Sequence, residues 1–226
     1  IAGNTTGGAA DFVVPLLIKS VSGSYAAIAT HQENSSGVYR QGNNIAKNEL
    51  TNGWHHIMLV KDGVNCTFYY DGQPNGTASF TTTPPATINL TTIGKGFNNW
   101  FLDGRLSNLA IWNTDQSANI ANIYNYGAPQ TSYTVTPKAW YKLDKTSKFT
   151  GLNPNWHSAL SFNGTSNYID LGTSVDLGIN NTISMWLNFD VDYDSVLLGE
   201  GSNPYDYLIY AKRSNPYNSG ISYVFY

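Results

Sequence analysis

The chain has few charged residues, and this scarcity excludes several functions. Only 12% of its 226 residues are Asp, Glu, Lys or Arg, the net charge is -3, and the 12 Lys and Arg are scattered along the sequence. A protein that neutralises nucleic-acid phosphates carries a basic patch or stripe, so we expect no nucleic-acid partner. Long apolar runs are also missing, because the longest run, Phe12–Ile18, has the length of a strand and contains Pro15. We therefore expect no membrane partner.

Cysteine is nearly absent as well. Cys66 is the single cysteine, so the chain cannot form an internal disulfide or a thiolate zinc site. The fold must be held by its apolar core, and a hydrophobic share of 41% is enough to build one. The sequence starts at Ile1 with no initiator Met and no signal-peptide pattern, so we expect the numbered chain to begin inside a longer product.

The residues that are plentiful indicate strands and turns. The chain is 14% aromatic and rich in Gly, Asn, Thr and Ser. Two strand-like runs, Trp54–Lys61 and Asn65–Tyr70, are separated by Asp62-Gly63, which predicts a β-hairpin. Both faces of the first run are largely apolar, as expected for a central strand of a two-layer sandwich.

Further strands and one helix are predicted by the same patterns. We expect the helix over Ser117–Tyr126, where Ile120, Ile123 and Tyr124 have helical spacing and Gly127 follows as a stop. Trp54, Trp112 and Trp186 sit in strand patterns, and we expect all three to be buried anchors of the core. The other predicted strands are Ala86–Ile93, Arg105–Trp112 after a turn at Leu102-Asp103-Gly104, Ala139–Asp144, Ala159–Phe162, Tyr168–Leu171, Thr182–Phe189, Ser195–Leu198, Tyr205–Ala211 and Gly220–Tyr226.

Several short stretches of the sequence resemble one known domain type. The stretch ALSFNGTSNYIDLG at 159–172 and TISMWL at 182–187 resemble the opening strands of laminin G-like, concanavalin A-like domains. The stretches GWHHIMLV at 53–60, FYYDG at 68–72, TIG at 92–94 and DGRLSNLAIWN at 103–113 resemble the closing half of the same domain. The resemblance implies an all-β fold, an antiparallel jelly-roll β-sandwich.

The order of these stretches is reversed relative to the family. In this chain the stretches of the opening half come after those of the closing half. The chain therefore contains either one circularly permuted domain or parts of two tandem domains. Two weak internal similarities favour tandem units. Ile1-Ala2-Gly3 is similar to Leu197-Leu198-Gly199, and Asp11–Val14 is similar to Asp206–Ile209; the second of these gives a period of 195 residues. We accordingly predict residues 1–131 as the C-terminal two-thirds of one domain, 132–157 as a linker with a short strand, and 158–226 as the N-terminal third of the next.

Catalytic patterns are not apparent in the sequence. Glycoside hydrolysis needs two carboxyl groups about 5 to 10 Å apart. The three glutamates, Glu33, Glu49 and Glu200, lie outside strand interiors, and the acidic alternation Asp190, Asp192 and Asp194 reads as a solvated turn or a cation site. His55 and His56 fall on opposite faces of one strand and cannot chelate one ion together, while His31 and His157 are isolated. We expect the protein not to be an enzyme.

The resemblance also suggests where ligands could bind. Jelly-roll domains often hold a structural Ca²⁺, and the family position makes Asp103 and Asn163 the candidate ligands, although each could equally satisfy its own turn. No other cofactor is expected. Aromatic platforms for sugars are available at Trp100, Phe101, Tyr205, Tyr207 and Tyr217.

Two functions of different class follow from this sequence. The first is a structural protein of a virion or extracellular surface assembly, such as a fibre, filament or capsid decoration, with identical or related subunits as partners. The linker word AWYKLD at 139–144 resembles linkers between laminin G-like domains of phage structural proteins, which implies a virion surface or an extracellular location. The alternative is a carbohydrate-binding adhesin whose partners are glycans.

Overall fold

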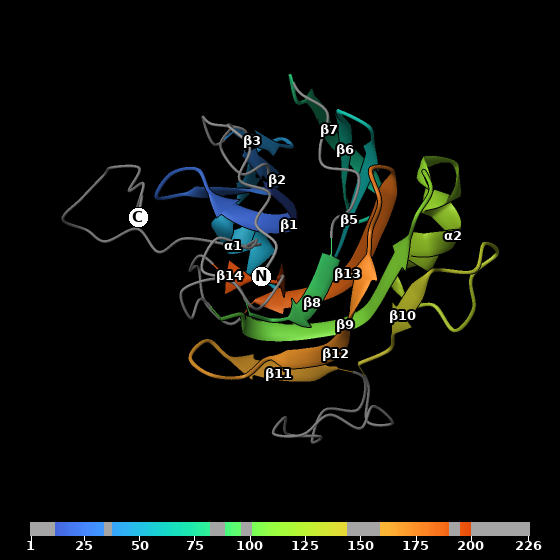
Figure 1. The fold of residues 1–226 in the computed structure, drawn as a ribbon. Helices are drawn as coiled ribbons and strands as arrows, with labels where there is room; N and C mark the ends of the chain where they lie inside the picture. The colour runs from blue at the N-terminus through green and yellow to red at the C-terminus, as the bar shows by residue number, and fades with distance from the viewer. Residues whose placement is uncertain are drawn as a thin grey trace, which may run out of the picture.

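The structure is an antiparallel β-sandwich with short helices. The computed structural model describes residues 12–33, 38–81, 89–95, 101–143, 159–189 and 195–199. Strands dominate these residues, and every strand pair within the sheets is antiparallel (Figure 1). The predicted all-β sandwich fold is thereby confirmed.

One layer contains a five-stranded sheet built on the hairpin of β1 and β2. Pro15 cannot donate a ladder hydrogen bond, and it lies at the irregularity between Val14 and Leu17, where the register of β1 against β2 shifts. The sheet order is β14-β1-β2-β3, and β4 also pairs with β2. The strands are β1 (Phe12–Ser20), β2 (Tyr25–Glu33), β3 (Val38–Gln41), β4 (Ile45–Ala46) and β14 (Ser195–Val196).

The second layer is a seven-stranded sheet that contains the predicted hairpin. The hairpin is formed by β5 and β6, and Gly63 adopts a φ of 55° in the connecting turn. As predicted, β5 is a central strand, with β6 on one side and β13 on the other. The order is β10 (Ala139–Tyr141), β9 (Asp103–Trp112), β13 (Asn181–Phe189), β5 (His55–Asp62), β6 (Asn65–Tyr70) and β7 (Gln73–Ser79), with β11 (Leu160–Asn163) also on β9.

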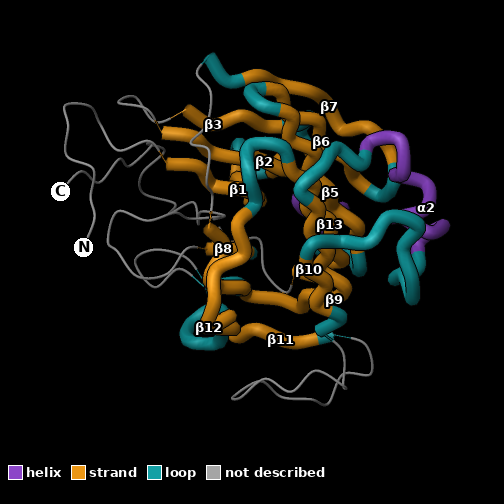
Figure 2. The backbone as a smooth tube through the Cα atoms, turned by 45° about the vertical axis from the view of Figure 1, so that its right-hand side comes forward, coloured by secondary structure: helices purple, strands orange, loops and turns teal. Residues whose placement is uncertain are grey.

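A three-stranded sheet completes the sandwich beside the five-stranded one (Figures 1 and 2). It consists of β12 (Ile169–Asp176), β8 (Asn89–Ile93) and β15 (Leu198–Gly199), with β8 in the middle. The main core joins all three sheets: Ile28 comes from the five-stranded sheet, Phe68 from the seven-stranded sheet and Ile93 from the three-stranded sheet, and each is fully buried. Burial of this apolar interior is the main force that holds the layers together.

A second, smaller core lies on the other face of the seven-stranded sheet. It joins Met58, Val60, Tyr69, Ala110 and Trp112 to Ile123 of the helix α2 (Ile120–Tyr124). The predicted helix over Ser117–Tyr126 is confirmed in position but is not continuous, because α2 is flanked by the 3-10 turns η2 (Ser117–Asn119) and η3 (Asn125–Gly127). A further short helix, α1 (Lys47–Leu50), was not predicted from the sequence.

Two of the three predicted tryptophan anchors are confirmed. Trp112 and Trp186 are 2% and 5% exposed, as expected for large aromatic side chains in a core. Trp54 is 41% exposed, so the prediction for this residue was wrong. The reason is that β5 begins one residue later, at His55, and Trp54 lies before the paired part of the strand.

Residues from the C-terminal part of the chain complete the sandwich within this chain. We call residues 159–199, which carry β11 to β15, the complementing segment, and residues 12–143 the body. β11 pairs with β9, β12 pairs with β8, and β13 lies between β9 and β5. The strand predicted in the linker is β10, which is not isolated but pairs with β9.

The permuted arrangement is therefore the one formed in the single chain. Sheet pairing crosses the boundaries predicted at residues 131 and 158, and those boundaries themselves stay a prediction. The predicted strands Tyr205–Ala211 and Gly220–Tyr226 lie outside the described residues.

Candidate functional site

The two candidate calcium ligands lie opposite each other at one end of the sandwich. Asp103 begins β9, Asn163 ends β11, and the strand register pairs them directly. The turn after β11 passes close to the carboxyl group, because a Cβ placed on Gly164 would lie 2.8 Å from Oδ2 of Asp103. The structure thus brings together two residues that are 60 positions apart in the sequence.

Asn163 is engaged by its own turn. Its Oδ1 accepts hydrogen bonds from the backbone N–H groups of Thr165, Ser166 and Asn167 at 3.1, 2.9 and 3.0 Å. Its Nδ2 donates to the hydroxyl of Ser166 at 3.0 Å. A calcium ion needs six to eight oxygen ligands, and the part of the chain that the structure describes holds no cluster of three His, Cys, Asp or Glu side chains suited to a metal. Asn163 therefore fits a turn cap better than a metal ligand, and the calcium site stays a prediction.

A lysine and two aromatic rings gather beside this turn. An isolated bridge pairs Lys95 with Phe101, and Tyr168 follows the Asn163 turn. The Lys95 Nζ lies 4.2 Å from the ring centroid of Tyr168 and 5.9 Å from that of Phe101, so the ammonium group interacts with both rings. Tyr168 is 37% exposed and Phe101 is half-buried, which leaves aromatic surface open to solvent.

This aromatic cluster agrees only partly with the sequence expectations. Phe101 was among the predicted sugar platforms, whereas Lys95 and Tyr168 were not. Tyr168 was treated as a strand residue, and its exposure depends on the turn that precedes β12. The other predicted platforms and the acidic run lie outside the described residues: Trp100, Tyr205, Tyr207, Tyr217, Asp190, Asp192 and Asp194.

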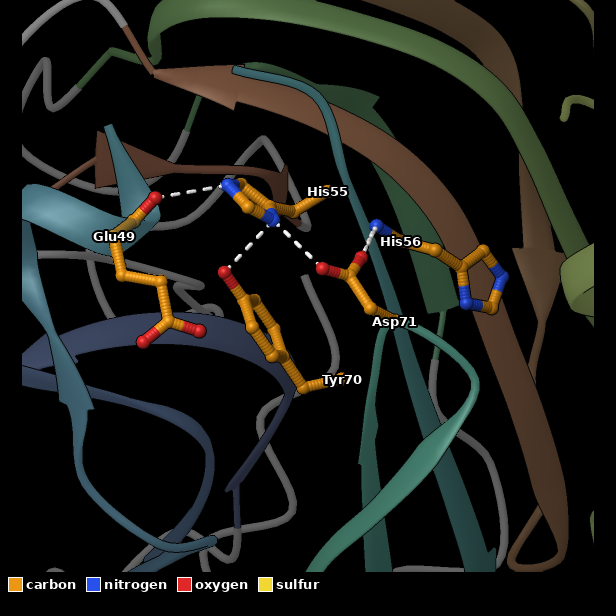
Figure 3. Close-up of polar contacts among 5 residues, drawn as sticks. All are labelled: Glu49, His55, His56, Tyr70 and Asp71. Carbon is orange, nitrogen blue, oxygen red and sulfur yellow. Dashed lines mark hydrogen bonds and ion pairs between the residues drawn. The ribbon is translucent and has the colours of Figure 1, made fainter. Parts of the chain in front are cut away.

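A second polar cluster surrounds His55 at the start of β5 (Figure 3). The His55 Nε2 lies 2.9 Å from the backbone carbonyl of Glu49, which can only accept a hydrogen bond. The His55 Nδ1 lies 2.8 Å from Oδ2 of Asp71 and 2.8 Å from the hydroxyl of Tyr70. The ring also stacks on Tyr70, with centroids 5.0 Å apart.

These contacts favour a positively charged His55. Nε2 must carry a proton to donate to the Glu49 carbonyl, and Nδ1 must carry one to donate to the Asp71 carboxylate. The hydrogen bond that His55 donates to Asp71 raises the pKa of His55 above its ordinary value, against the opposing effect of burial. The ion pair with Asp71 therefore ties β5 to the turn after β6, and the hydrogen bond to the Glu49 carbonyl ties β5 to α1.

His56 lies on the opposite face of β5 and is neutral. It is 1% exposed, and its Nε2 lies 2.8 Å from the Ser184 hydroxyl. Its ring packs against those of Tyr124 and Trp186, at centroid distances of 5.6 and 5.4 Å. Burial lowers the pKa of His56 to about 4, so the ring carries no charge at neutral pH. The opposite faces predicted for the two histidines are confirmed by these contacts.

Asp71 connects both histidines. Its Oδ1 accepts the backbone N–H of His56 at 2.8 Å while its Oδ2 pairs with His55. Asp71 itself has a φ of 47°, a conformation that Asp tolerates better than most residues. In the sequence, Asp71 was noted only within the stretch FYYDG at 68–72 that carries the family resemblance. The arrangement can stabilise the hairpin, and nothing in it requires a substrate.

We expect the Asp71→Asn variant to lose stability in a pH-dependent way. His55 has a raised pKa, so its contribution is fully present below the unfolded value of 6.5 and is lost as the pH rises through the folded value. The variant should lose about 1–2 kcal/mol at pH 5.5 and less at pH 8.5, measured by urea unfolding. Asp115→Asn is the control, because Asp115 caps the N–H of Ser117 without a histidine partner. An equal loss at both pH values would contradict the ion pair.

Comparison with known proteins gives one match. A family model described as the concanavalin A-like lectin/glucanases superfamily matches residues 16–121. Neither the curated proteins nor the solved structures yield a match to the chain. The matched residues run from β1 into α2, and they exclude the complementing segment. Among the described helices, none combines the length and apolar character needed to cross a membrane.

Proposed function

Residues 16–121 belong to the concanavalin A-like lectin/glucanase superfamily, and on this basis we propose that the chain is a non-catalytic structural module of an extracellular or virion-surface assembly. Laminin G-like domains are generally non-catalytic and typically extracellular. The proposal assigns this module to the scaffold of the assembly, with related subunits as its partners.

One observation supports the structural role above the alternatives. The central strand β13 comes from the complementing segment, yet it pairs along its length with both β9 and β5 of the body. A sandwich whose centre is supplied by a separate stretch of chain is suited to linking successive units. The similarity between short stretches 195 residues apart in the sequence supports such repetition.

The location of the protein tests this proposal. Antibodies raised against the recombinant chain should bind the outside of intact particles or cells that carry the protein, as seen by gold labelling in the electron microscope. The labelled structures should be ordered appendages, fibres or shells. Labelling that requires permeabilised cells, or that is confined to the interior, would refute the proposed role.

A second candidate function is carbohydrate binding, which the cluster of Lys95, Phe101 and Tyr168 favours. Exposed aromatic faces suit the apolar faces of sugar rings, and the Lys95 ammonium group beside them can donate hydrogen bonds to sugar hydroxyls. Glycan-array binding by the recombinant chain that disappears in Tyr168→Ala would support it. Tyr25→Ala is the matched control, because Tyr25 is also exposed, at 46%, and starts β2 in another sheet. A blank array would leave the structural role alone.

A further inference from the structure

The complementing segment is indispensable to the core of the body. Among the residues that the structure describes, ten of the 28 in the main core come from it. Without these side chains the body would expose the apolar faces that they cover, and it would lose the closed interior that holds the layers together. The ten residues are Leu160, Phe162, Ile169, Leu177, Ile183, Met185, Leu187, Phe189, Leu197 and Leu198.

Removal of the segment would also expose strand edges in the middle of the sheet. β13 pairs with β5 over Asn181–Leu187 and with β9 over most of its length. Without it, both neighbouring strands would present unpaired N–H and C=O groups. Such edges readily pair with another strand, so the body is an acceptor that requires a donor strand.

Polar contacts make the acceptor specific for this segment. The Ser184 hydroxyl lies 2.8 Å from the buried Nε2 of His56, within hydrogen-bond distance. Thr182 donates to the carbonyl of Thr114 at 2.8 Å. Because a one-residue slip would leave these groups unpaired, the contacts fix the register of β13. The best donor is therefore a segment of the same sequence.

The segment is joined to the body by a single passage of chain. Residues 144–158 connect β10 to β11, and fifteen residues can span up to roughly 50 Å. All contacts between segment and body are non-covalent, so the same contacts form whether the segment comes from the same chain or from a neighbour. Exchange of an identical element between copies is a low-cost route to assembly.

We infer that the complementing segment of one copy completes the body of a second copy, head to tail. This inference rests on the proposed structural function and names its partner, which is another copy of this chain or a repeat of it. The protein concentration decides whether the segment binds the body of its own chain or that of a second copy. A tethered segment meets its own body at an effective concentration of order mM. Packing copies together in an assembly favours exchange.

Engineered disulfides can detect the exchange. Arg105 and Ser161 lie directly opposite each other on β9 and β11, one in the body and one in the segment, and both are half-buried. We expect the variant Arg105→Cys/Ser161→Cys, in a Cys66→Ala background, to form covalent multimers when refolded at high protein concentration and then oxidised. The ladder on a non-reducing gel should lengthen with protein concentration and disappear on reduction.

The control pair lies entirely within the body. Thr67 and Thr77 face each other on β6 and β7, so Thr67→Cys/Thr77→Cys in the same background should give oxidised monomers only. Oxidised monomers alone from the Arg105/Ser161 pair, at every concentration, would overturn the exchange.

Sedimentation of the unmodified chain, refolded over the same concentrations, tests the exchange without any substitution. Larger species would support the exchange, and monomers at every concentration would refute it. Surface labelling of the assembly is independent of this result, so failure of the exchange can be told from failure of the proposed function.

Discussion

The Gly104→Ala variant is expected to lose about 4 kcal/mol of stability, enough to unfold a marginal domain. Gly104 lies in β9 opposite Phe189 of β13, with a φ of 147°. An added Cβ would lie 2.4 Å from the backbone carbonyl oxygen of Asn188 and 3.1 Å from the Cα of Phe189. Both obstacles belong to the backbone of β13, so neither can rotate away. The free energy of unfolding in urea measures the loss.

Gly53→Ala separates steric clash from backbone strain. Gly53 has nearly the same φ, 145°, but a Cβ there would meet nothing within 4 Å. We expect this variant to lose about 1–2 kcal/mol from strain alone. The difference between the two variants then reports the contact between β9 and β13. Equal losses would show that β13 does not occupy the position beside Gly104.

The Lys61→Met variant is expected to gain about 3 kcal/mol of stability at pH 7. Lys61 is 1% exposed, and its Nζ has no hydrogen-bond partner among the described residues; the nearest favourable contact is the Phe80 ring, 5.5 Å away. Burial lowers the pKa of Lys61 from 10.5 to about 8. A shift of this size corresponds to about 3 kcal/mol of destabilisation of the charged form. Methionine keeps the length of the side chain without the charge.

The pH dependence of this gain identifies its cause. The folded state prefers the neutral amine, so the penalty is complete below pH 8 and shrinks as the pH rises toward the unfolded value of 10.5. The stability difference between Lys61→Met and the unmodified chain should therefore narrow between pH 7.5 and 9.5. Lys138→Met is the control, because Lys138 is exposed and pairs with Asp176 at 3.7 Å. A gain that is constant with pH would contradict the role of the buried charge.

Local patterns in the sequence predicted most of the strands. The hairpin of β5 and β6 follows from Asp62-Gly63 between two apolar runs, and both its strands were placed within one residue. The helical segment near Ile123 was found from its spacing and the glycine that follows. In these segments the information lies within a few residues, so tertiary contacts do not need to be known.

Long-range pairing could not be predicted in the same way. The position of β13 between β9 and β5 depends on contacts with residues at least 70 positions earlier in the chain. Gly104 was interpreted as part of a turn, whereas it lies in β9 and admits the close approach of β13. Lys61 was expected on an apolar strand face, but burial of its amine depends on how Phe80 and the neighbouring strands cover it.

In the candidate sites, too, single residues could be predicted from the sequence, whereas their contacts with distant residues could not. Asp103 and Asn163 were chosen separately, and only the pairing of β9 with β11 shows that they face each other. The ion pair joins His55, at the start of β5, to Asp71, directly after β6, so hairpin register could have suggested it. The aromatic cluster at Tyr168 needs the fold of the preceding turn, which Asn163 holds together.

The pairing of β14 with β1 determines how the module would respond to mechanical force. β14 and β1 are antiparallel, and among the described residues they pair at Leu17 with Val196 and at Ile18 with Ser195. Tension that separates the start of β1 from the end of β14 loads the hydrogen bonds of these residue pairs one after the other, so each pair breaks separately. The ladders on either side of β13, when pulled along the strand, must instead break many hydrogen bonds together. A pulled module would therefore release β14 first and lengthen while its central sheet stays intact.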